Sequence, residues 1–368
     1  MANVDELPIF KASDGREVTL LPGWFEKKFK LGWPYGIKDF RKFVETCIEQ
    51  PETGATYPVN PLFFLNKLVT TNTIKCILEE IGYRFDGSAR LLDICTGPAI
   101  LPRAFKALGL CREAHGIDIQ DRQNEYSDDE FLQLWKGSWD ATFQEGFEFG
   151  KPIFELYERI NKNTTGINNC FDLLFSTDRL NSEYSMDSYA VENFLSYEPA
   201  RKFEIVTMMS GADYFDMEDF FRRVSGLMEA GGILVTLNEY CYDTYACAMH
   251  LPMDAPWLHT RLTKDDLLRY YEELRPDIKD LAKKAVYFPS IHLTVQDYAD
   301  AARKSGLEIV SYKRKIETEY VRSTLFSDPS LRNYFFRHVV PDARAVNKHV
   351  VTDDFFTSWL TMVYRKVA

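Results

Sequence analysis

An aspartate, a turn of small residues and a second aspartate are spaced as a nucleoside-binding site requires. The turn, DICTGPA, covers residues 93–99 and separates a short apolar run, 89–94, from a helical pattern over 100–108. A ligand can approach such a backbone closely, because no long side chain fills the space. Asp118 lies in the next apolar run, 115–119, and its carboxylate would accept hydrogen bonds from both hydroxyls of a ribose.

The charge beside the turn favours one nucleoside cofactor over another. A dinucleotide is bound by a G-x-G-x-x-G turn and by a helix N-terminus that faces its pyrophosphate. Here the turn has a single glycine, Gly97, followed by Pro98, and Asp93 stands in front of it. A carboxylate at that place repels pyrophosphate and suits the cationic amine end of S-adenosylmethionine (SAM). The residues therefore favour SAM over NAD.

Strand-like and helix-like segments alternate after residue 88, which predicts an α/β fold with a mostly parallel sheet. Helical patterns cover 66–82, 100–108, 216–228 and 294–305, and strand candidates cover 89–94, 115–119, 171–176, 203–208, 233–237, 307–310 and 359–365. We expect residues 1–88 to form a helical N-terminal cap. Residues 89–368 form the main domain, with insertions at about 122–170 and 241–292 that act as lids or substrate walls.

Five segments resemble, in the right order, the motifs of class I SAM-dependent methyltransferases. They are LLDICTGPAILPRAF (91–105), HGIDIQD (115–121), LLFSTD (173–178), the stretch from FEIVTMM to VTLNE (203–239), and LTVQDYADAARKSGLEIVSY with the terminal FTSWLTMVYRKVA (293–312 and 356–368). This resemblance implies a Rossmann-like sheet of seven strands, mostly parallel, with helices on both faces. It also implies SAM as the cofactor and methyl transfer as the reaction.

The resemblance assigns cofactor contacts to particular residues. Asp93 and Gly97 would hold the methionine part, Asp118 the ribose and Asp178 the adenine amino group, with Asp172 or Asp187 as alternatives to Asp178. Glycines are usual in this family where this chain has Cys95 and Ala99, and Cys95 adds bulk beside the methionine part. The other predicted cofactor-binding residues are Thr96, Pro98, Ile119, Gln123, Arg179, Met208 and Met209, of which the two methionines equally fit core packing.

A narrower resemblance concerns the nicotinamide and phenylethanolamine N-methyltransferase group. The Gly-Pro turn with a small residue after it, and the long insertion after the second motif, are similar to that group. Tyr57 is the nearest candidate for its N-terminal aromatic motif and is included among the cofactor-binding residues.

Residues that act on the acceptor are harder to identify, because methyl transfer is an in-line displacement that mainly needs alignment. Glu239 directly follows a predicted strand and is our candidate for an acceptor anchor or a general base. Tyr242 and His259, in the predicted lid, complete the catalytic set, although packing roles fit both equally well. The same rim also contains Asp213, Tyr214, Tyr240 and His250.

Composition limits the partners. The formal net charge of −11 disfavours a nucleic acid, and six dispersed histidines give no metal-ligand spacing. Seven scattered cysteines without a CxxC motif indicate free thiols in a reducing compartment. No signal peptide and no long apolar stretch is visible, so we expect a cytoplasmic protein without a membrane partner.

These observations predict a methyltransferase that acts on an N or O atom of a small molecule. Two alternatives stay open. One is a SAM-binding protein of the same fold without methyl transfer, such as a cyclase helper or a regulatory binder. The other is an NAD(P)-dependent oxidoreductase, against which the missing G-x-G-x-x-G turn counts. The acceptor and the oligomeric state do not follow from the sequence.

Overall fold

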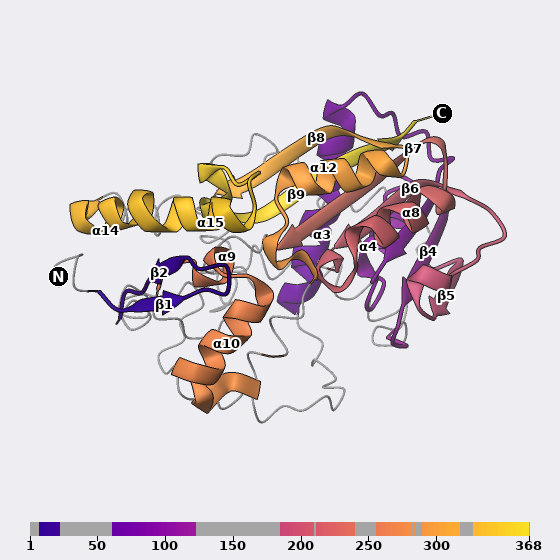
Figure 1. Cartoon of the computed structure of the whole chain (residues 1–368). Helices are drawn as coiled ribbons and strands as arrows, with labels where there is room; N and C mark the ends of the chain where they lie inside the picture. The colour runs from indigo at the N-terminus through magenta and orange to yellow at the C-terminus, as the bar shows by residue number, and fades with distance from the viewer. Residues whose placement is uncertain are drawn as a thin grey trace, which may run out of the picture.

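A seven-stranded sheet forms the centre of the described chain, which comprises residues 7–22, 61–122, 185–209, 211–239, 255–280, 283, 289–316 and 327–367 of the computed structural model (Figure 1). The strand order is β5-β4-β3-β6-β7-β9-β8. All neighbours are parallel except β9, which is antiparallel to both β7 and β8. The strands are β3 (Arg90–Ile94), β4 (Glu113–Asp118), β5 (Ser188–Val191), β6 (Phe203–Met209), β7 (Met228–Glu239), β8 (Leu307–Ile316) and β9 (Thr357–Lys366).

Helices cover both faces of this sheet because successive side chains of each strand point to opposite sides. On one face, Leu91, Ile205 and Val235 belong to a buried cluster with α3 (Pro61–Glu80) and α4 (Ile100–Ala107). On the other, Leu92, Val206 and Leu234 join a cluster with α8 (Met217–Leu227) and α12 (Val295–Lys304). The mostly parallel, seven-stranded α/β sheet predicted from the sequence is confirmed.

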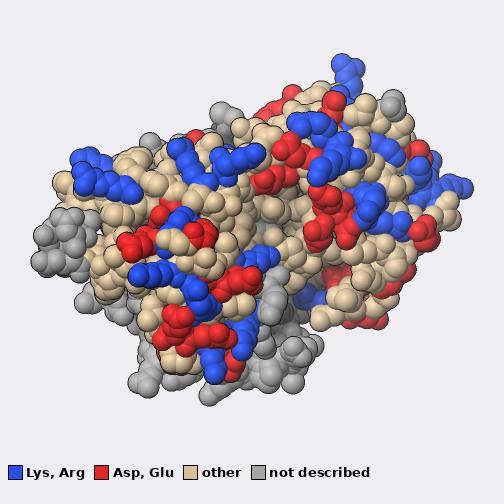
Figure 2. All heavy atoms as spheres, in the orientation of Figure 1, with Lys and Arg blue, Asp and Glu red and all other residues tan. Residues whose placement is uncertain are grey.

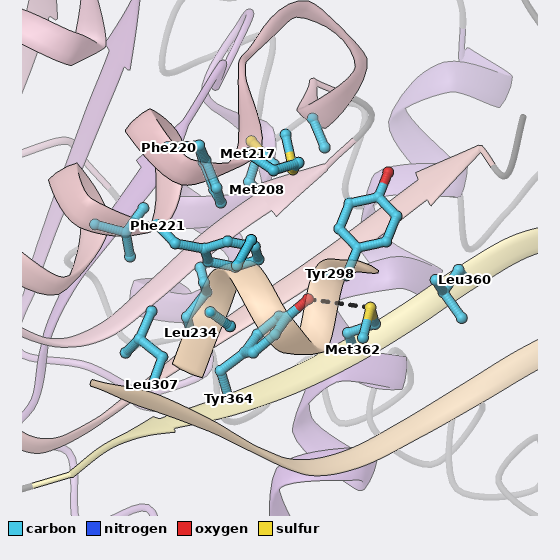
Figure 3. Close-up of a cluster of buried hydrophobic side chains, with 14 of the residues drawn as sticks. Met208, Met217, Phe220, Phe221, Leu234, Tyr298, Leu307, Leu360, Met362 and Tyr364 are labelled. Atoms are coloured by element: carbon cyan, nitrogen blue, oxygen red, sulfur yellow. Dashed lines mark hydrogen bonds between the residues drawn. The ribbon is translucent and has the colours of Figure 1, made fainter. Parts of the chain in front are cut away.

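Figure 3 shows how the second cluster is filled. Phe220 and Phe221 of α8 and Tyr298 of α12 pack over Leu234 of β7. The buried Tyr364 hydroxyl donates a hydrogen bond to Met362 Sδ (3.0 Å) on the same strand. Buried hydroxyls need such a partner. The hydrogen bond therefore offsets the cost of burying the Tyr364 hydroxyl in this aromatic-rich layer.

The edge strand beside β4 differs from the prediction. We expected residues 171–176 to provide the third-motif strand, but Ser188–Val191 pairs with β4 there, with Gly116 opposite Tyr189. Residues 171–176 lie outside the described part, together with Tyr57, Gln123, Asp178, Arg179 and Tyr242. β5 has four residues and is only half-buried, so it lacks the apolar run by which a strand is recognised.

Three separate segments form a smaller body, which we call the cap, on the left of Figure 1. The first is the antiparallel hairpin of β1 (Ile9–Lys11) and β2 (Glu17–Thr19). The second contains α9 (Leu258–Arg261), α10 (Lys264–Leu274), η6 (Pro276–Ile278) and η7 (Pro289–His292). The third contains α14 (Pro329–Tyr334), the π-helical turn η9 (Phe335–Val339), α15 (Val340–Val346) and η10 (Thr352–Phe356).

Two features of the cap were not predicted. The N-terminal 88 residues contain a hairpin besides the helix α3, so they are only partly helical. The segment between β8 and β9 contains helices, and the sequence predicted no structure for it. Pro341 stands at the start of α15 and has no N–H to donate, which accounts for the wide turn η9 just before it. Among the described helices, none has the length and apolarity needed to cross a bilayer.

The cap and the carboxyl ends of the parallel strands lie at the same edge of the sheet. The second cap segment follows Glu239, the last residue of β7. The third leaves β8 after Ile316 and returns at Thr357, which is opposite Ile316 in the register. The short helix η5 (Ala212–Tyr214), which follows β6, packs against η7 of the cap. Any ligand at this edge therefore lies close to the cap.

Arg261 joins the three cap segments. Its fully buried guanidinium forms a salt bridge with Asp342 (2.7 Å) and donates hydrogen bonds to Tyr334 Oη (2.7 Å) and to the carbonyl of Thr19 (2.9 Å). Tyr334 Oη in turn donates to the same carbonyl at 2.6 Å. A buried charge is tolerated only when it is paired and hydrogen-bonded, so the three segments must all be in place around this side chain.

Replacing Arg261 by Ala should lower the free energy of unfolding by about 3 kcal/mol, because Asp342 loses its buried counter-ion and the Tyr334 hydroxyl loses a charged donor. Chemical denaturation measures this loss. Arg303→Ala is the control: its pair with Asp300 is exposed (2.8 Å) and should contribute less than about 0.5 kcal/mol. Equal effects of the two substitutions would contradict the role given to Arg261.

Candidate cofactor site at the carboxyl edge of the sheet

The turn after β3 has an alternating left-handed backbone. Cys95, Gly97 and Ala99 have φ angles of 55°, 55° and 56°. Only glycine adopts this conformation freely, and a residue with a Cβ is strained there by about 1–2 kcal/mol. These are the three positions at which the first methyltransferase motif usually has glycine. Two of these three left-handed positions hold residues with a Cβ, Cys95 and Ala99.

Cys95 fills the space between the ends of β3 and β6. Its Sγ lies 2.9 Å from the place where a Cβ on Gly211 would be, so the glycine after β6 makes room for the thiol. Burial, with Asp118 and Asp93 nearby, raises the pKa of Cys95 to about 12. The thiol is therefore protonated at neutral pH, which excludes it as a ready nucleophile.

Asp93 is buried in front of the turn, with 2% of its surface exposed. It lies opposite Thr207 of β6 in the register, and the Thr207 hydroxyl donates a hydrogen bond to Asp93 Oδ1 (2.7 Å). Burial raises the pKa of Asp93 to about 6, although the Thr207 hydrogen bond and the positive charge of Lys67 lower it. A cationic ligand group would favour the ionised form further.

Lys67 of α3 is a member of the site that sequence reasoning missed. Burial lowers the pKa of its ammonium, whereas the charge of Asp93 raises it. The helix supplies a signal that could have revealed it. Thr71, Ile74 and Leu78 are buried, and Lys67 continues their i, i+4, i+7, i+11 spacing on the inward side. A lysine on such a stripe needs a partner.

Asp118 lies beside the turn, as predicted for a ribose-binding acid. Its Oδ2 accepts a hydrogen bond from Gly97 N (2.8 Å), and its Oδ1 accepts one from Gln120 N (3.1 Å). Each carboxylate oxygen has further lone pairs for a ligand. Ile119, the following residue, is 74% exposed and available to cover a flat ring.

Two residues on the other side of Gly97 were also missed. The Tyr189 hydroxyl of β5 contacts the Gly97 carbonyl (2.9 Å). Arg122 Nη1 lies 3.5 Å from the place where a Cβ on Gly97 would be. Two anions, Asp93 and Asp118, and two cations, Lys67 and Arg122, therefore surround this turn.

Other predicted cofactor residues belong to the packing around the turn. Thr96, Pro98 and Ala99 are buried in it. Met208 and Met209 are buried in the two clusters on opposite faces of the sheet, which favours the core-packing reading. Asp187, an alternative to Asp178, lies at the start of β5 and accepts hydrogen bonds from Lys106 Nζ and Ala114 N, both at 2.8 Å. It is at the amino edge, away from the turn, so that alternative is wrong.

The acceptor-side candidates are placed only in part. Glu239 ends β7 opposite Trp359 of β9, at the carboxyl edge as expected, and its side chain lies outside the described atoms. His259 is fully buried in α9, and its carbonyl accepts a hydrogen bond from His292 Nε2 (2.8 Å). Its ring therefore faces no solvent-accessible site. Tyr214 in η5 is 69% exposed at the same edge as the turn.

Within the described ranges, no three His, Cys, Asp or Glu residues are grouped as a metal site would need.

No protein-family model matches the sequence, and comparison with curated proteins finds no match. Solved structures do match. A SAM-dependent methyltransferase from Mesorhizobium loti is 16% identical, with 78% of this chain and 95% of that chain covered and a TM-score of 0.36.

A SAM-dependent methyltransferase from Clostridium acetobutylicum is 11% identical, with 89% of this chain and 99% of that chain covered and a TM-score of 0.37. The N-methyltransferase NodS from Bradyrhizobium japonicum is 9% identical, with 82% of this chain and 94% of that chain covered and a TM-score of 0.33. The strand order and the antiparallel β9 described above decide the architecture. The chain has a Rossmann-like α/β fold. In this fold, ligands bind at the carboxyl edge where Asp93 and Asp118 meet.

Gly97→Ala should lower the free energy of unfolding by about 1 kcal/mol, because its φ of 55° strains any residue with a Cβ. Denaturant titration measures the change. Gly226→Ala in α8 is the matched control, since nothing lies within 4 Å of its Cβ position and its φ is not left-handed. That variant should be neutral or slightly stabilised, and a loss equal to that of Gly97→Ala would refute the explanation.

The raised pKa of Asp93 predicts a pH-dependent stability. The unfolded state releases this proton near pH 3.8 and the folded state only near pH 6. The stability of the wild type relative to Asp93→Asn should therefore fall by about 2 kcal/mol as the pH rises from 4 to 7. Unfolding curves of both proteins at the two pH values measure it. A constant difference would show that Asp93 titrates normally.

Proposed function

We propose that this protein is a SAM-dependent methyltransferase that transfers a methyl group to an N or O atom of a small molecule. The observation that carries the proposal is the arrangement at the carboxyl edge: buried Asp93, a glycine turn at Gly97 and Asp118 within hydrogen-bond distance of that turn. It lies beside the central strand β3, where a class I fold takes its cofactor.

The charges around the turn suit the groups of SAM. Its methionine end carries an ammonium and a carboxylate, for which Asp93 and the cation of Lys67 are the complementary charges. Asp118 is the acceptor for ribose hydroxyls. SAM supplies a methyl group on a positively charged sulfur. The chain's contribution is to orient the acceptor and to exclude water, and Glu239 at the end of β7 stays our candidate for an anchor or base.

The cap supports a small acceptor. Its segments leave from the carboxyl ends of β7 and β8, so they flank the cofactor edge. On the face shown in Figure 2, the described Lys and Arg side chains are interspersed with Asp and Glu, and they form no continuous basic band. Together with the net charge of −11, this disfavours a nucleic-acid acceptor. The free thiols of Cys76, Cys95 and Cys111 fit a reducing, cytoplasmic compartment.

Cys95 favours one second candidate, a SAM-binding protein of this fold that transfers no methyl group. Its thiol lies against Gly211, and the resemblance implies that a glycine in place of Cys95 would leave more space beside the methionine end. The two candidates differ in product. Incubation with methyl-labelled SAM and a panel of amines and phenols should give a labelled small molecule if methyl transfer occurs. Tight SAM binding without any labelled product would favour the second candidate.

Isothermal titration should show binding of SAM and of its demethylated product, S-adenosylhomocysteine, and none of NADH. Asp118→Asn should weaken the binding at least about 10-fold, because charge-assisted hydrogen bonds to the ribose are lost. Asp300→Asn, an exposed change in α12, is the control and should bind as the wild type does. A folded wild-type protein that binds neither SAM nor its product would end this proposal.

A further inference from the structure

Both backbone polar groups of Gly97, its N–H and its carbonyl, are held by side chains of the protein. Its N–H donates to Asp118 Oδ2 (2.8 Å), and its carbonyl accepts from the Tyr189 hydroxyl (2.9 Å). The same hydroxyl lies 3.0 Å from the Gln120 carbonyl and accepts a longer hydrogen bond from Arg122 N (3.4 Å). One side chain of the edge strand β5 thus connects the turn after β3 with the loop after β4.

The protonation state of Tyr189 permits this role. Burial raises the pKa of its hydroxyl, and the carboxylates of Asp118 and Asp121 nearby raise it too. The hydroxyl therefore keeps its proton at physiological pH and shares it between the two carbonyl oxygens. A phenylalanine ring would fill the same space and leave both carbonyls without this donor.

The turn needs such a restraint because it is strained. Cys95 and Ala99 have side chains at left-handed positions, and strained conformations persist only where the surroundings over-determine them. Without a hold on Gly97, which lies between them, the peptide could rotate and relieve the strain. The turn would then lose the backbone course along which a nucleoside can approach.

We propose that Tyr189 is a positioning residue that keeps the strained 95–99 turn and the 118–122 loop in the conformation that binds the cofactor. This inference rests on the proposed SAM-binding function for its effect on affinity. Tyr189 acts through Gly97 and the loop of Asp118 and is not required to touch SAM. In a turn with three glycines, the same hydroxyl would matter less.

Tyr189→Phe should weaken S-adenosylhomocysteine binding about 10-fold in isothermal titration, while the melting temperature changes by less than about 3 °C. Adding Ala99→Gly should restore most of the affinity, because glycine removes strain at the next left-handed position. Tyr312→Phe, on the opposite edge strand β8, is the matched control and should bind as the wild type does. If Tyr189→Phe folds poorly, the double variant is compared directly with Ala99→Gly.

Two outcomes would overturn the role of Tyr189. One is unchanged affinity in Tyr189→Phe, and the other is a loss that Ala99→Gly does not relieve, which would indicate general packing. Amide hydrogen exchange in the ligand-free protein is a separate readout: exchange at Gly97 should be faster in Tyr189→Phe. If the wild type binds no S-adenosylhomocysteine, the proposed function fails, and exchange at Gly97 alone decides whether Tyr189 holds the turn.

Discussion

The reversal of strand order at β3 is the constraint on which the site depends. From β3 the chain passes to β4 on one side through α4, and β6 pairs on the other side and continues through α8. These helices belong to clusters on opposite faces of the sheet. The two crossover helices therefore diverge at the carboxyl end of β3, as at the switch points of other open α/β sheets. Asp93 and the turn after it lie at this point of divergence.

The site combines features that each oppose folding. A carboxylate is buried with a pKa of about 6, and two residues with side chains have left-handed φ angles. Such features persist when the surrounding structure outweighs them, and they mark functional places more often than neutral ones. Here the surroundings are the hydrogen bond from Thr207 to Asp93 and the paired contacts of Gly97 with Asp118 and Tyr189. Pre-organisation of this kind lowers the entropy that a ligand must lose on binding.

The parts of the fold that the sequence predicted correctly have strong local signals. The apolar run before Asp93, the glycine-bounded helices and the apolar run 233–237 within β7 are each visible within a dozen residues. The same reasoning located Asp93, Gly97 and Asp118, because their places follow from strand ends. It missed β5, since SYAV is short and half-exposed, and β1 and β2, since strands of three residues carry no periodicity.

Contacts between distant residues could not be read from the sequence at all. Lys67 is separated from Asp93 by a helix and a loop, and Tyr189 from Gly97 by 92 residues. The cap is a further case, because its three segments lie far apart in the sequence. Its parts come together only through long-range contacts such as those of Arg261, and no residue spacing along the chain predicts these contacts.

The scattered origin of the cap also bears on how the protein is made. The hairpin is synthesised among the first residues, yet the carbonyl of Thr19 is bound by Arg261, which follows 242 residues later. Asp342, the counter-ion of that arginine, follows a further 81 residues on. On the ribosome, the apolar side of the hairpin, with Phe10 and Val18, therefore stays without its packing partners until residues 255–291 have emerged. The sheet can begin to assemble during translation, whereas the cap closes only when translation is almost complete.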